Sequence, residues 1–241
     1  MTRLLLHVEG QTEESFVIEL LAPYLYSRGY TVVSARIVGN ARQRDRRGGI
    51  RPWPAVRRDI VNHLREDSGC VVSTMIDFYG LPPTGPRAWP GRMTAASAVY
   101  TEKAKAVEDA LFADICHQMG SNFNANRFIP YVMMHEFEAM LFSDCVRFSR
   151  GIGFPGLAPR FQAIRDGFSN PEEIDDSPQT APSKRVEELV LGYSKPLMGT
   201  LGVLEIGLES IRAECPHFRN WLELLESNPF VNKAGPWTVP D

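Results

Sequence analysis

Residues 3–14 read RLLLHVEGQTEE, an apolar run that ends at an acid and a glycine. The segment from Arg3 to Val8 alternates little, which is typical of a strand buried on both faces of a parallel sheet. Thr12 can cap a helix, and Glu13 and Glu14 stand in its first turn. A buried strand that passes directly into a helix favours an α/β fold.

The segments that follow continue this alternation. Apolar residues at helical spacing extend the first helix to Arg28, and β-branched runs indicate further strands. The other predicted elements are a strand over Tyr30–Val38, a helix over Trp53–Glu66, a strand over Cys70–Ile76, a helix over Thr94–Gln118 and a strand over Phe128–Met134. Their order predicts that residues 1–150 form a mostly parallel sheet with helices on both faces.

The remaining residues, 151–241, have a different composition. Gly, Pro, Ser and Asp are frequent over 151–182, which indicates a long loop with short helical turns. Two final helices are predicted, one with Leu204 and Leu208 on the same face and one around Trp221. We expect a loop-rich and helical C-terminal extension that packs on the α/β domain.

Composition argues against several classes of protein. With 241 residues, 44% of them hydrophobic, the chain can form a large core without disulfides. A net charge of −3 argues against bulk electrostatic coating of nucleic acid, although it allows a local basic patch. The four cysteines form no CxxC pair, and no apolar stretch has the length of a signal peptide or a membrane span. We expect a cytoplasmic protein that does not enter membranes.

Acidic residues follow three of the predicted strands. Glu9 follows the first strand, Asp77 the third, and Glu136 and Glu138 the fourth. Because open parallel sheets bind ligands beyond the carboxyl ends of their strands, we expect these side chains to converge at one edge. Two like charges about 4 Å apart repel by roughly 4 kcal/mol at an effective dielectric near 20, so the cluster needs protons or a cation. Mg²⁺ or Mn²⁺ with oxygen ligands would satisfy it.

Each acid also has a purely structural interpretation. Glu13 can complement the dipole of its helix, and Asp77 can form a turn before Gly80. Glu136 and Glu138 share a face if they end a strand, but they point about 160° apart if the segment is already helical. The sequence leaves these alternatives open.

Two groups of cations accompany the acids. Between Arg36 and Arg58 the chain has eight arginines and one acid, and Arg suits bidentate contact with phosphate. This segment predicts a clamp on a nucleic-acid backbone, and a solvated loop is the structural alternative. The predicted contacts are Arg44, Arg46, Arg47 and Arg51, and the second group of cations is Lys184 with Arg185. A cation beside a phosphate would stabilise the charge that grows during attack on phosphorus.

Several segments, taken together, resemble known families. They are HVEGQTEE (7–14), RRGG (46–49), MIDFYGLP (75–82), HEFEAMLFSD (135–144), APSKR (181–185) and the pair IGLESIR (206–212) with CPHFRNW (215–221). A strand ending in VEG, with acids after the third and fourth strands, resembles the TOPRIM domain, the metal-binding module of topoisomerases, primases and overcoming-lysogenization-defect (OLD) nucleases. Nearly the whole chain more closely resembles a TOPRIM-like family of uncharacterised proteins, domain of unknown function family 4276.

The TOPRIM resemblance implies roles for individual residues. It makes Glu9 the first acid of a metal site, Asp77 the first Asp of the next motif, and Lys184 the later lysine of OLD-type nucleases. TOPRIM enzymes usually have Asp-x-Asp at the second motif, but this chain has Tyr79 at the third position. Another acid must therefore supply the missing ligand, or one ion binds more weakly.

These inferences combine in one hypothesis, a Mg²⁺- or Mn²⁺-dependent nuclease that hydrolyses DNA or RNA. Glu9 and Asp77, with Glu136 or Glu138, would hold the ion, and Glu13 would orient or deprotonate the attacking water. Lys184 would stabilise the transition state, and the arginines, including Arg185, would hold the polymer. The resemblance also implies an ATPase partner and a role in phage defence. The alternatives are a non-catalytic subunit that binds nucleic acid or an ATPase, and nucleotidyl transfer as in primases.

Overall fold

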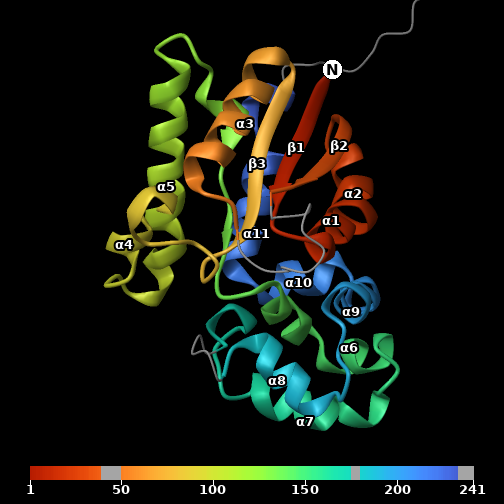
Figure 1. The fold of residues 1–241 in the computed structure, drawn as a ribbon. Helices are drawn as coiled ribbons and strands as arrows, with labels where there is room; N and C mark the ends of the chain where they lie inside the picture. Colours follow the sequence, from red (N-terminus) through yellow and green to blue (C-terminus); the bar gives the residue numbers. More distant parts are fainter. Residues whose placement is uncertain (39–49, 175–179, 233–241) are drawn as a thin grey trace, which may run out of the picture.

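The computed structural model describes residues 1–38, 50–174 and 180–232 of the chain. Figure 1 shows a central sheet with helices on both sides and further helices beyond one end of the strands. The helices are α1 (Gln11–Phe16), α2 (Ala22–Tyr26), α3 (Trp53–Glu66), α4 (Arg92–Ala95), α5 (Tyr100–Met119), α6 (Cys145–Gly151), α7 (Ala158–Arg165), α8 (Pro182–Leu189), α9 (Thr200–Ile206), α10 (Leu208–Glu214), α11 (Pro216–Glu226) and α12 (Pro229–Asn232). Within the described ranges, no helix combines the length and the apolar character needed to cross a membrane.

Within the described residues the sheet has five strands, and every pair is parallel. β1 (Thr2–Val8) lies between β2 (Tyr30–Ile37) and β3 (Cys70–Asp77), and the other side of β3 pairs first with β4 (Phe128–Ile129) and then with β5 (Val132–Met133). The strand order is β2-β1-β3-β4. The predicted α/β fold with a parallel sheet and a helical C-terminal region is confirmed.

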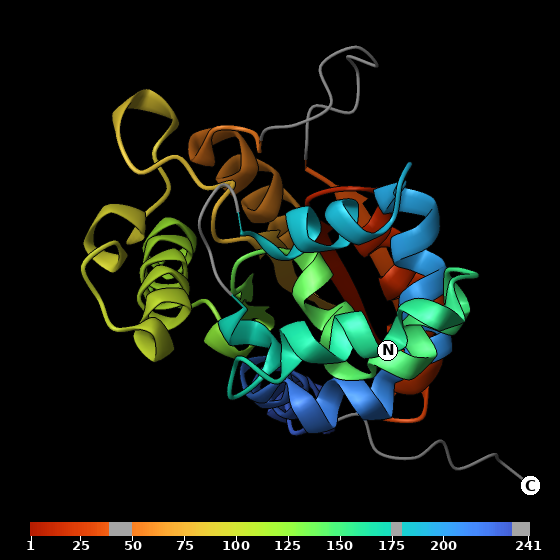
Figure 2. The same cartoon turned by 90° about the horizontal axis from the view of Figure 1, so that it is seen from below.

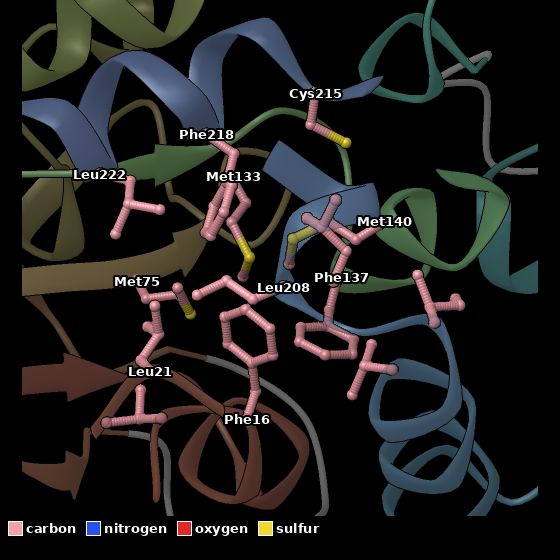
Figure 3. Packing of buried hydrophobic residues seen from close by; sticks show 14 of the residues in the cluster. Phe16, Leu21, Met75, Met133, Phe137, Met140, Leu208, Cys215, Phe218 and Leu222 are labelled. Atoms are coloured by element: carbon pink, nitrogen blue, oxygen red, sulfur yellow. The ribbon is translucent and has the colours of Figure 1, made fainter. Parts of the chain in front are cut away.

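Two hydrophobic clusters cover the two faces of the sheet. On one face, α3 and α5 bury residues such as Ile60 and Val107 against the sheet. On the other face, α1 and α2 pack beside α10 and α11. Figure 3 shows how Phe16 of α1, Met75 of β3 and Phe218 of α11 meet in this second cluster. N-terminal and C-terminal segments of the chain therefore share one core.

Helices α6 to α9 lie beyond the carboxyl ends of the strands (Figure 1), and the view from below shows them in front of the sheet (Figure 2). α6 packs closely on α9, where a Cβ at Gly202 would come within 2.8 Å of the Phe148 ring. This layer therefore covers the end of the sheet at which the predicted site residues stand.

The predicted strand over Phe128–Met134 is divided into β4 and β5. Pro130 lies between them and has no N–H to donate to the sheet. The hydroxyl of Thr74 bridges the gap, since it donates to the Tyr131 carbonyl at 2.8 Å and accepts from the Tyr131 N–H at 2.9 Å. The chain thus keeps its direction along β3 and carries the following acids to the same edge.

Two predicted helical segments and one predicted loop also differ from the structure. The single helix expected over Thr94–Gln118 is two helices, α4 and α5, because Ser97 Oγ donates to the Thr94 carbonyl and closes a turn there. The long loop with short helical turns expected over 151–182 does contain short helical turns, but it also contains the eight-residue helix α7, which buries only Phe161 and so has little helical periodicity. Leu204 and Leu208 belong to different helices that separate at Gly207, whose φ is +80°.

The start of the first helix also differs from the prediction. Gly10, and not Thr12, stands at the N-cap, and the carboxylate of Glu13 accepts the Gly10 N–H at 2.8 Å. Thr12 is buried in the first turn. The helix runs through a π-helical stretch at Val17–Leu21 and ends at Tyr26, close to the predicted end.

Candidate functional site

Glu9 and Asp77 lie together at the carboxyl ends of neighbouring strands. Val8 of β1 is paired with Met75 of β3, so the next residues of both strands emerge at the same edge. The Asp77 N–H donates to Glu9 Oε2 at 3.2 Å across a sequence separation of 68 residues. A Cβ at Gly80 would come within 3.2 Å of the same Glu9 oxygen, so glycine leaves the space that this carboxylate occupies.

Glu136 and Glu138 reach this edge from β5. Met133 is paired with Asp77, and Glu136 follows in an extended conformation before a 3₁₀-helical stretch over Phe137–Ser143. Both carboxylates face the same ammonium group, with Nζ distances of 3.9 Å for Glu136 and 3.0 Å for Glu138. Glu136 Oε2 also accepts the N–H of Ser183 at 3.0 Å. The sequence left open whether one or both of these acids would face the site. In the structure Glu136 is extended and Glu138 stands in the 3₁₀-helical stretch, and both carboxylates face the site.

The backbone between β5 and these acids is strained at His135. Its φ is +66°, a region that residues other than glycine rarely adopt and that costs on the order of 1 kcal/mol or more. The ring of Tyr79 stacks on the His135 ring with a centroid separation of 5.6 Å. Tyr79 therefore packs over the turn that presents Glu136.

The cation that meets the acids is Lys195, a residue that sequence reasoning missed. It begins a π-helical stretch at Lys195–Gly199, just before α9. Lys184, which the sequence favoured, binds Glu187 on its own helix at 2.6 Å and is half-exposed. The only usable signal for Lys195 was indirect, because a buried acidic cluster requires a cation from some other segment.

Burial and mutual repulsion raise the pKa values of four acids at this edge, Glu9, Glu13, Asp77 and Glu138. Burial, followed by the charges of Glu9 and Glu13, raises the pKa of Asp77 well above its usual range. Burial raises the pKa of Glu9, and it raises those of Glu13 and Glu138 to about 7. For Lys195, burial lowers the pKa, but the charges of Glu138 and Glu136 outweigh this effect and raise it overall. Lys195 is therefore positively charged. Its single charge cannot balance all the acids, so the others need protons or a cation.

A family sequence model matches residues 8–226. The chain belongs to the family described as domain of unknown function DUF4276. Comparisons with curated proteins and with solved structures gave no match. The predicted membership is confirmed over most of the chain, and the relation to TOPRIM domains remains a prediction.

One oxygen of the strand-end acids has no partner among the described residues. Asp77 Oδ1 is buried and accepts no hydrogen bond from any residue that the structure describes. A buried carboxylate oxygen without a partner is costly and calls for a donor or a cation. The hard oxygen donors of this cluster suit Mg²⁺ or Mn²⁺. As the described side chains stand, however, no three His, Cys, Asp or Glu residues are close enough together to hold one ion. The donor chemistry fits a metal, but side chains must turn to bind it.

The predicted nucleic-acid contacts are only partly described. Arg44, Arg46 and Arg47 lie outside the described residues. Arg51 donates to Asp59 at 2.7 Å, so part of its guanidinium is already engaged. Arg185 donates to the Thr180 carbonyl at 2.8 Å and lies over the Phe168 ring. Neither of these two arginines presents an unengaged guanidinium.

A separate hollow of about 540 Å³ lies between α5, β4 and α11. Its walls contain paired charges, with Lys105 bound to Asp109 at 2.8 Å and His217 bound to Glu108 at 2.9 Å. None of the strand-end acids lines it. The buried Asp77 oxygen without a described partner and the acids with raised pKa values lie at the strand ends, so we place the candidate site there.

Proposed function

We propose that this DUF4276 protein is a divalent-cation-dependent nuclease that hydrolyses phosphodiester bonds in DNA or RNA. The observation that carries the proposal is the unpartnered, buried Asp77 oxygen among acids whose pKa values are raised. Perturbed acids gathered at the carboxyl end of a parallel sheet are typical of functional sites. The resemblance to TOPRIM domains, which assigns Glu9 and Asp77 to the metal site, supports the same reading.

The acidic residues would have two roles, metal binding and proton transfer. Glu9 and Asp77 would hold Mg²⁺ or Mn²⁺ with help from Glu136 or Glu138, and the bound ion would supply positive charge at a phosphoryl oxygen. Glu13, with a pKa of about 7, can accept a proton from the attacking water near neutral pH.

The positive charges have separate tasks. We assign the transition-state cation to Lys195 in place of Lys184, because its ammonium lies among the acids. The arginines at positions 44, 46 and 47 would hold the polymer backbone. An ATPase partner and a role in phage defence, which the resemblance implies, belong to the same proposal.

A second candidate is a non-catalytic subunit that binds nucleic acid or an ATPase. Two observations favour it: Tyr79 packs on His135 in place of a second Asp, and Lys195 already neutralises part of the acidic charge. The two candidates differ in whether the acids are required for a chemical step.

The direct test is incubation of the purified protein with plasmid DNA and with single-stranded DNA and RNA. We expect cleavage with Mn²⁺ and none with EDTA. Binding of any of these polymers without cleavage under both conditions would favour the non-catalytic subunit. Added nucleoside triphosphates would reveal nucleotidyl transfer as a longer product.

Metal binding should also depend on pH, because the ion must displace protons. Carboxyl groups whose pKa is raised by folding make the free protein less stable as pH rises from about 4.5 to about 7. A bound cation offsets this loss of stability only at pH values at which the acids are ionised in the folded protein. We expect the increase in Tm caused by Mn²⁺ to grow by roughly 2–4 °C per pH unit between pH 6 and 7.

Differential scanning fluorimetry with a fixed Mn²⁺ concentration measures this effect. Glu13→Gln should reduce the pH dependence, because one of the displaced protons is then absent. Exposed Asp109, which pairs with Lys105, provides a matched variant, Asp109→Asn, that should leave the dependence unchanged. An increase in Tm that is equal at pH 6 and pH 8 would contradict a site built from these acids.

A further inference from the structure

Tyr193 has a buried hydroxyl without a partner. The residue stands between α8 and the π-helical stretch that begins at Lys195, and its ring packs against the core of the second hydrophobic cluster. Tyr193 Oη makes no hydrogen bond within the described part of the chain. A buried hydroxyl in this state is destabilising, so either it serves a bound group or phenylalanine would serve as well.

The hydroxyl lies at the junction of the elements that form the acidic site. A Cβ at Gly199, in the stretch that begins with Lys195, would come within 3.3 Å of Tyr193 Oη and within 3.0 Å of the Thr12 methyl. Thr12 is the neighbour of Glu13 in α1. Gly199 thus allows the start of α1, the Lys195 segment and the Tyr193 hydroxyl to meet closely.

The surroundings keep this hydroxyl protonated. Burial, followed by the charges of Glu138, Glu187 and Glu136, raises the pKa of Tyr193. Glu138 and Glu136 are the carboxylates that Lys195 contacts, yet neither accepts the Tyr193 proton. The site therefore contains a neutral donor whose acceptor must come from outside the described chain.

We propose that Tyr193 Oη donates a hydrogen bond to a non-bridging phosphate oxygen of the ligand that binds beside Lys195. This inference rests on the proposed nuclease function and adds a substrate-contacting residue to it. An anionic oxygen is the acceptor that such a site lacks, and a neutral donor can contact it without competing with Lys195 for the carboxylates. Because the contact is made to an oxygen present before and during the reaction, its loss weakens binding more than turnover.

Tyr193→Phe in the full chain tests the proposal. The probe is a fluorescein-labelled oligonucleotide, DNA or RNA, titrated with Ca²⁺ in place of Mn²⁺. We expect Kd and KM to rise about tenfold and kcat to stay within about twofold. The Tm of the free variant should equal or exceed that of the wild type, since an unpaired buried hydroxyl has been removed.

Tyr30→Phe is the matched control. The Tyr30 hydroxyl is buried too, but it donates to the Leu225 carbonyl at 3.0 Å, away from the acids. This variant should lower Tm by about 2–4 °C and leave Kd unchanged. Opposite responses of the two variants would separate ligand contact from structural support.

The outcomes separate failure of the nuclease function from failure of the proposed Tyr193 contact. If the wild type neither binds nor cleaves the oligonucleotides, the nuclease function fails and the role of Tyr193 fails with it. If the wild type is active and Tyr193→Phe has an unchanged Kd, only the role of Tyr193 is overturned, and a buried water is then the partner of the hydroxyl. A weaker Kd accompanied by a clear drop in Tm would assign Tyr193 a structural role and would also overturn the proposal.

Discussion

Asp77→Asn is expected to lower Mn²⁺-dependent cleavage on the order of a thousandfold and, at the same time, to stabilise the metal-free protein. Asn has nearly the same shape as Asp but carries no charge to hold a cation. Burial and the charges of Glu9 and Glu13 already oppose ionisation of Asp77. Removing the charge should therefore stabilise the free fold by roughly 1–3 kcal/mol at pH 8.

The pH dependence of this gain identifies its cause. Because folding raises the pKa of Asp77, the wild type loses stability as pH rises above the ordinary pKa of an Asp, so the advantage of Asp77→Asn should be smaller at pH 5 than at pH 8. Urea denaturation at pH 5 and pH 8 measures the difference, and cleavage of labelled oligonucleotides measures activity. Asp109→Asn, which removes an exposed and paired carboxylate, should change neither. Full activity in Asp77→Asn would rule out this residue as a metal ligand.

The sequence was sufficient to predict the fold class and the placement of the strand-end acids at one edge of the sheet. Parallel strands direct their carboxyl ends the same way, so identifying the strand that ends at Glu9 and the one that ends at Asp77 implies that they are neighbours if the strands pair. The β1–β3 pairing meets that condition. The division of the fourth strand could also have been predicted, since Pro130 cannot donate to a sheet. The catalytic and metal-binding roles of these acids remain predictions.

Features that depend on contacts between distant segments could not be predicted from the sequence. The positive φ of His135 is imposed by the turn between β5 and Glu136, and no local pattern indicates it. Lys195 stands in a short stretch with Pro and Gly, where periodicity gives no information about burial. Lys184 looked the better candidate because it begins a helix in a recognisable motif, but helix geometry points it toward Glu187.

Lys195→Met is expected to destabilise the protein by roughly 2–3 kcal/mol at pH 8. Removing one partner of a buried ion pair usually costs about 3–5 kcal/mol, because the other charge is left buried and unpaired. The side chain of Glu138 is 2% exposed, whereas that of Lys195 is 42% exposed. Water therefore screens part of the interaction, and we expect a cost below that of a fully buried pair. Lys184→Met removes a lysine whose Glu187 partner is exposed, and it should change stability by less than about 0.5 kcal/mol.

The cost of Lys195→Met should depend on the charge of its partner. Burial raises the pKa of Glu138 to about 7, so at pH 5 this carboxyl is protonated and needs no cation. Most of the destabilisation should therefore disappear at pH 5, and Glu138→Gln should reduce it at pH 8 in the double variant. Urea denaturation of the four proteins in this cycle at both pH values measures the coupling. A loss that is equal at the two pH values and additive with Glu138→Gln would mean that Lys195 contributes through the packing of its aliphatic chain, and the acids would then have to be compensated by protons alone.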